Sequence, residues 1–92
     1  MGRFFFGAKI IDQLAPNTAG GASFTVPVGT YLLTVTGEEI EICRGATIAQ
    51  GQGTPLVRAT QLMVDLFAPE TWAIRSLGGT GRLVLTTAQN NG

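Results

Sequence analysis

The chain has 92 residues, of which 45% are hydrophobic and 13% are charged, and its six basic and six acidic residues leave no net charge. This composition predicts one folded domain, because two cores would each have too little apolar area to bury and a disordered tail would need more charge. Without a basic patch, nucleic acid is not an expected partner. One cysteine and no histidine exclude an internal disulfide and an ordinary zinc site within one chain.

Residues 1–20 are predicted to be an extended strand or arm followed by a linker. Three phenylalanines follow one another here, Phe4, Phe5 and Phe6, and an extended strand puts at least one of their rings on each face. Glycine, lysine and aspartate at positions 7, 9 and 12 interrupt the apolar residues before a signal peptide or a membrane span could form. The stretch from Ala15 to Ala22 is rich in small residues, which is typical of a linker.

Residues 21–88 show the period-two alternation of apolar and polar side chains that is typical of half-buried strands. Turn residues separate these runs, and no stretch keeps the period of a helix. With the N-terminal segment, the expected strands are Arg3–Ile11, Ser23–Val26, Thr30–Thr36, Glu39–Arg44, Leu56–Ala59, Gln61–Phe67, Thr71–Ser76 and Arg82–Thr87. The sequence therefore predicts an all-β sandwich of two antiparallel sheets at 21–88, with a flexible tail at 89–92.

Two segments of the chain echo each other. In each, a proline precedes a threonine and an aromatic residue, Tyr31 or Trp72. An aliphatic residue follows two positions past the aromatic, and a glycine follows six positions past it. We expect the proline to end one strand and the aromatic side chain to enter the next strand, pointing between the sheets. Two such units facing each other would close a sandwich.

Two glycine-rich stretches, Gly51–Gly53 and Gly78–Gly81, could be imagined to hold a phosphate. Neither is followed by Lys-Ser/Thr or opens a helix, so both are predicted to be turns. The second is expected to be a tight hairpin between the strands of Trp72 and Leu83, with glycines at positive φ.

Groups that carry chemistry are sparse. Glu38, Glu39 and Glu41 could offer oxygens to a hard cation, but no acidic partner stands at the spacing of a binding loop, so a solvated strand face is favoured. Cys43 is expected to be an ordinary strand residue, and the serines have no histidine base. The sequence therefore predicts no enzyme activity, metal or cofactor.

A resemblance to a known family rests on two stretches. Phe24–Gly37 reads FTVPVGTYLLTVTG, and Trp72–Thr86 reads WAIRSLGGTGRLVLT. They resemble the jelly-roll modules of tailed-bacteriophage virion proteins, especially small head-decoration and head-fibre-base proteins, over about two thirds of the chain. The second copy departs from the family, because Pro69-Glu-Thr-Trp72 stands where Pro-Ala-Gly-Thr-Tyr is common.

The resemblance implies a jelly-roll-like sandwich that acts as a decoration or cement protein on the capsid surface, assembled in the host cytoplasm. Its partners would be the major capsid protein or further copies of itself, with a trimer at local threefold positions as the natural arrangement, and no membrane. One alternative is a carbohydrate-binding module for host attachment, and another is a tail or baseplate accessory protein. Tyr31 and Trp72 are in phase with inward aliphatic residues, so we expect them in the core; exposure of either ring would favour glycan binding.

The candidate partner interface lies in the N-terminal segment and consists of Phe4, Phe5, Phe6, Ile10 and Ile11. Burying one phenylalanine stabilises a contact by roughly 1.5–3 kcal/mol, so this apolar segment is expected to be covered. Two arrangements are open. The segment is either the first strand of the domain's own sheet or an arm that binds a neighbouring subunit or the capsid.

Overall fold

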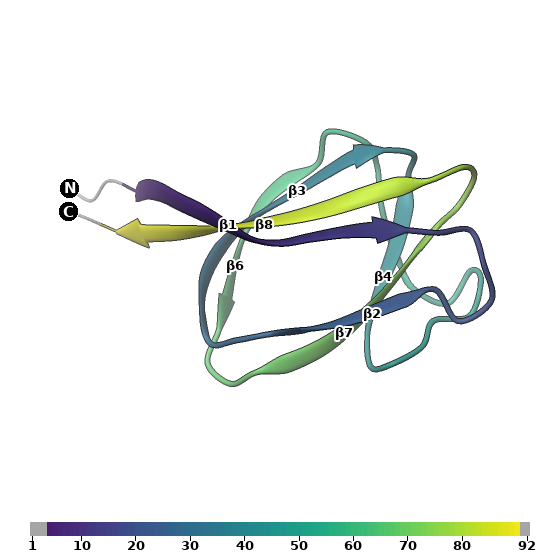
Figure 1. Ribbon diagram of the computed structural model, residues 1–92, viewed down its shortest axis with the longest axis horizontal. Helices are drawn as coiled ribbons and strands as arrows, with labels where there is room; N and C mark the ends of the chain where they lie inside the picture. Colours follow the sequence, from purple (N-terminus) through teal and green to yellow (C-terminus); the bar gives the residue numbers. More distant parts are fainter. Residues whose placement is uncertain (1–3, 91–92) are drawn as a thin grey trace.

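The computed structural model describes residues 4–90, which form eight strands in two four-stranded antiparallel sheets (Figure 1). The strands are β1 (Phe4–Ala15), β2 (Ala22–Val26), β3 (Gly29–Gly37), β4 (Ile40–Arg44), β5 (Thr54–Leu56), β6 (Gln61–Leu66), β7 (Glu70–Ser76) and β8 (Gly81–Asn90).

The strand order is β1-β8-β3-β6 in the first sheet and β2-β7-β4-β5 in the second. Each strand pairs with its counterpart counted from the other end of the chain: β1 with β8, β2 with β7, β3 with β6 and β4 with β5. A ribbon of two paired halves, folded so that successive pairs alternate between two sheets, is the jelly-roll arrangement. The predicted all-β, two-sheet, jelly-roll-like sandwich is therefore confirmed.

The core lies between the sheets and is built from the apolar half of each alternation. On β3, for example, Tyr31, Leu33 and Val35 are buried, while the residues between them are only partly covered. The buried cluster comprises Ala15, Val26, Tyr31, Leu33, Val35, Ile40, Leu66, Trp72, Ile74, Leu83 and Leu85.

The two echoing aromatic residues occupy equivalent places. Both rings are buried, which confirms their predicted core position. The Tyr31 hydroxyl donates to the carbonyl oxygens of Pro27 (2.7 Å) and Val28 (3.1 Å), and Trp72 Nε1 donates to Glu70 Oε1 (2.9 Å). Tyr31 thus satisfies its buried polar tip in the crossover that precedes β3, and Trp72 does so at the first residue of β7. Because β2 pairs with β7 and β3 with β6, the two crossovers lie at the same end of the sandwich.

The predicted hairpin at Gly78–Gly81 is wrong. β7 belongs to the second sheet and β8 to the first, so this turn passes between the sheets. All three glycines of the turn lie within residues 4–90, and none has a positive φ. At Gly81 the requirement is space, because a Cβ atom there would collide with Ile40 Cγ2 and would lie 2.7 Å from the Glu38 carbonyl oxygen.

Residues 45–53, which join β4 to β5, fold back over the outer face of the second sheet. Ile48 of this loop is buried, and its N–H donates to the carbonyl oxygen of Gly20 at 3.2 Å. Its side chain packs so closely over Gly21 and Gly53 that a Cβ atom at either glycine would come within 2.8 Å of it. The loop therefore forms a third layer over part of the sandwich.

Glu41 lies beneath this loop and is only 2% exposed. Its Oε2 atom accepts the Gly51 N–H at 3.0 Å, and its Oε1 atom accepts the Gly53 N–H at 3.1 Å. The predicted solvated face is therefore wrong for Glu41, although Glu38 and Glu39 are exposed. Alternation correctly predicts that the Glu41 side chain points away from the core. The pattern does not show that a loop covers that face of the sheet.

Strand boundaries differ from the predictions by more than one residue in three strands. β1 continues to Ala15, which is fully buried at the expected start of the linker. β8 continues to Asn90, two positions into the expected tail. β5 is displaced to Thr54–Leu56 because the chain turns immediately afterwards, with Ala59 at φ 71°. Predictions for positions 1–3 and 91–92 lie outside the described residues.

Candidate interaction surfaces

The predicted interface residues all lie on β1, the edge strand of the first sheet. Phe4, Phe5 and Phe6 pair with Asn90, Gln89 and Ala88 of β8, and their side chains lie outside the described part of the structure. β8 pairs with β3 only as far as Thr87, so beyond this residue β1 and β8 form a two-stranded ribbon. Figure 1 shows this ribbon, 4–6 with 88–90, projecting past the rest of the sandwich.

The other two interface residues have different surroundings. Ile10 is 38% exposed, whereas Ile11 packs against the core cluster. Ile10 is therefore open to a partner, and Ile11 belongs to the chain's own interior. Of the two arrangements that the sequence left open, the structure shows β1 as the first strand of the chain's own sheet.

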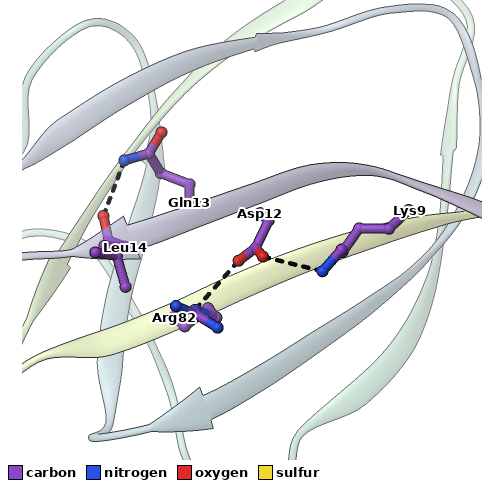
Figure 2. A network of polar contacts seen from close by, with 5 residues as sticks. All are labelled: Lys9, Asp12, Gln13, Leu14 and Arg82. Carbon is purple, nitrogen blue, oxygen red and sulfur yellow. Dashed lines mark hydrogen bonds and ion pairs between the residues drawn. The ribbon is translucent and has the colours of Figure 1, made fainter.

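The remainder of the β1 edge is poorly suited to accept another strand. The pairing with β8 is irregular between Phe6 and Lys9 and between Lys9 and Ile11. Asp12 bridges two cations on the sheet surface, with Lys9 Nζ 3.0 Å from its Oδ2 atom and Arg82 Nε 3.2 Å from its Oδ1 atom (Figure 2). Bulges and charged side chains are common protection against edge-to-edge pairing. A partner would therefore meet the ribbon tip in preference to this edge.

A second apolar feature lies at the base of the ribbon. Val28, in the crossover from β2 to β3, is 56% exposed. It borders an open hollow of about 300 Å³ whose far side is formed by Thr87 and Ala88 of β8. The ribbon, this hollow and Val28 together form the ribbon end of the molecule.

A larger groove opens at the edge of the sandwich that lies across the first sheet from β1, between β6 and the β4–β5 pair. It has a volume of about 420 Å³. Its apolar lining consists of Ile42, Val64, Leu66 and Trp72. Arg44, Asp65 and Glu70 also line it, and Arg44 Nη2 lies 3.4 Å from Glu70 Oε2.

Phe67 stands beside this groove. It lies in the crossover from β6 to β7, between Leu66 and Glu70, which both line the groove, and it is 93% exposed. A phenyl ring left almost wholly in water is an apolar surface without a partner in its own chain. The groove and Phe67 together form the groove edge of the molecule.

Comparisons with protein-family models, curated proteins and solved structures find no match. The surfaces must therefore be interpreted from geometry. Within residues 4–90, no three His, Cys, Asp or Glu side chains gather where they could hold a metal ion. The same range contains no helix long and apolar enough to cross a membrane. Because Tyr31 and Trp72 are buried, neither offers the exposed ring on which the glycan-binding alternative depended.

Sequence reasoning missed the groove edge. A signal for Phe67 was present, because Leu62, Val64 and Leu66 share one phase of β6 and the next residue falls on the opposite phase. The groove itself had no such signal. Its lining comes from β4, β5, β6 and β7, which meet only after the chain has folded.

Proposed function

We propose that this chain is a structural virion protein of a tailed bacteriophage, a decoration or cement protein that binds the capsid surface and stabilises contacts between capsomers. The resemblance of Phe24–Gly37 and Trp72–Thr86 to phage jelly-roll modules supports the virion assignment. The jelly-roll topology agrees with this resemblance and is equally compatible with a tail or baseplate accessory protein.

The ribbon end is the observation that carries the proposal. An isolated two-stranded ribbon is marginally stable in water at best, and three or more strands or a packing surface are needed. Here the ribbon extends beyond β3 and has three consecutive phenylalanines in one strand. Val28 adds exposed apolar surface at its base. Such a feature gains stability when another protein covers it, as a capsid surface would.

Binding without chemistry suits a protein present in many copies. Each contact at the ribbon end is small, but contacts repeated by the symmetry of a shell add together through avidity. Zero net charge and few charged residues also mean that close packing of many copies meets little electrostatic repulsion.

Copy number tests the proposal. Quantitative mass spectrometry of purified particles is expected to find on the order of hundreds of copies of this chain per particle, as symmetry of a head requires. A handful of copies would indicate a tail or baseplate role instead, and absence from particles would contradict the virion assignment.

A substitution in the ribbon tests the surface. Phe5→Asp is expected to abolish incorporation into particles, because it places a charge in the surface that the partner covers. Leu14→Asp is the matched control, since Leu14 lies on the same strand, is 49% exposed and is distant from the ribbon. Circular dichroism of both purified variants separates loss of binding from loss of folding. Equal incorporation of the two folded variants would contradict a role for the ribbon end.

A further inference from the structure

From the groove edge, we propose that two copies of this chain associate about a twofold axis, each inserting Phe67 into the groove of the other. The proposal uses different residues from the ribbon end, although the crossover that carries Phe67 lies beside the crossover that carries Val28. Its test uses purified protein alone, so that it stands or falls independently of the virion role.

The knob and the hole are adjacent on one surface. Phe67 is 93% exposed, and the residues that flank its crossover, Leu66 and Glu70, line the groove. A patch that holds both a protrusion and a complementary depression fits a copy of itself after a rotation of 180°, and both contacts then form at once. A knob and a hole on well-separated faces would instead produce head-to-tail contacts.

The groove has the chemistry that a phenyl ring requires. Its lining includes Ile42, Val64, Leu66 and Trp72, and its volume of about 420 Å³ leaves ample space for one aromatic side chain. Phe24 already packs edge-to-face on Trp72, with ring centroids 6.0 Å apart. An entering ring would extend this aromatic contact.

The charges at the rim are also self-complementary. Arg44 is a cation whose side chain is 78% exposed, and it stands beside the carboxylate of Glu70, with Asp65 on the facing strand. Because both signs occur on the same patch, the cation of one copy can face an acid of the other without bringing like charges together. A partner of uniform charge would lose this match.

The oligomeric state in solution is the primary test. Size-exclusion chromatography with light scattering is expected to show twice the 9.6 kDa chain mass. Phe67→Ser is expected to raise the dissociation constant at least about 30-fold for each ring removed, and a twofold pair loses two rings. Val57→Ser is the matched control, because Val57 is 59% exposed and lies in the turn between β5 and β6, which enters β6 at the end opposite to Phe67. Its dissociation constant should match that of the unsubstituted chain.

The single tryptophan supplies a second readout. Trp72 lines the groove, so its emission is expected to change with protein concentration in the unsubstituted chain and in Val57→Ser but not in Phe67→Ser. A monomer at every concentration, or an association that Phe67→Ser leaves unchanged, would overturn the proposal. A mass of three chains would overturn the twofold arrangement.

A crosslink locates the contact. In a Cys43→Ser background, chains carrying Phe67→Cys are mixed with chains carrying Thr54→Cys, whose substituted position lines the groove. With an added thiol oxidant such as diamide, which accepts the two electrons, rapid formation of a disulfide between the two kinds of chain is expected. When Val57→Cys replaces Phe67→Cys, the mixed disulfide should form no faster than by random collision. Equal rates in the two mixtures would contradict insertion of Phe67.

Discussion

At the scale of single residues, Glu41 shows how a buried charge is held without a cation. Its two carboxylate oxygens each accept one backbone N–H from the loop over the second sheet, at Gly51 and Gly53. Hydrogen bonds to an ionised acceptor are stronger than neutral ones. The carboxylate thus fastens the loop to the sheet, and the glycines that could have suggested a phosphate site instead bind an anion of their own chain.

This geometry predicts that Glu41→Gln destabilises the fold by about 1–3 kcal/mol, because one oxygen is replaced by an NH₂ group that faces an N–H donor. Urea unfolding followed by circular dichroism measures the change. Glu39→Gln is the control, since Glu39 is exposed on the same part of the chain, and it should stay within about 0.5 kcal/mol of the unsubstituted protein. If the two variants lost equal stability, the hydrogen bonds from Gly51 and Gly53 to Glu41 would contribute no measurable free energy of unfolding.

At the scale of elements, the turn between β5 and β6 contains a strained residue. Ala59 has φ 71°, and its N–H donates to the Val35 carbonyl oxygen at 2.8 Å, while the Val35 N–H donates to Thr60 at 3.1 Å. Left-handed backbone costs an alanine about 1–2 kcal/mol. The turn adopts this conformation because it lets residues 59 and 60 continue the ladder onto β3.

We therefore expect Ala59→Gly to stabilise the protein by up to about 1 kcal/mol, since relief of strain exceeds the extra freedom that glycine gains in the unfolded chain. Thermal unfolding would show a higher midpoint. Ala46→Gly, at an exposed loop position without positive φ, should lower the midpoint slightly. A lower midpoint for Ala59→Gly as well would show that the backbone at Ala59 is not strained.

The elements also show which parts of the fold the sequence could predict. Alternation located six of the eight strands, because a half-buried strand marks its own faces. The predicted Leu56–Ala59, which rested on no such alternation, shares only Leu56 with β5. Alternation could not distinguish a glycine that adopts a positive φ from a glycine that leaves space for a neighbouring side chain. Gly78–Gly81 was therefore assigned a positive φ, whereas Gly81 is required by the close approach of Ile40. Nor could it reveal covering segments. Glu41 and the groove beside Phe67 depend on strands and loops that are distant in the sequence, and no local period records them.

At the scale of the whole molecule, the pairing of strands from opposite ends of the chain sets the order of folding. β4 and β5 are joined by residues 45–53 alone, whereas β1 and β8 come from the two ends of the described chain. Closing a longer loop costs more entropy before any contact forms. We expect strand pairing to begin with β4 and β5 and to proceed outward, with β1 joining β8 last. Folding is expected in the millisecond-to-second range that is usual for β-sandwiches.

Two isoleucines in equivalent surroundings test this order. Ile42 on β4 and Ile11 on β1 are both partly buried and packed against the core cluster, so replacement of either by alanine should cost about 1–3 kcal/mol. Ile42→Ala is expected to lower the folding rate, while Ile11→Ala mainly raises the unfolding rate. Stopped-flow fluorescence of the single tryptophan, at concentrations where the chain is monomeric, measures both rates. An equal slowing of folding by the two variants would show that β1 is already docked in the transition state. Pairing would then not begin at the central strands β4 and β5.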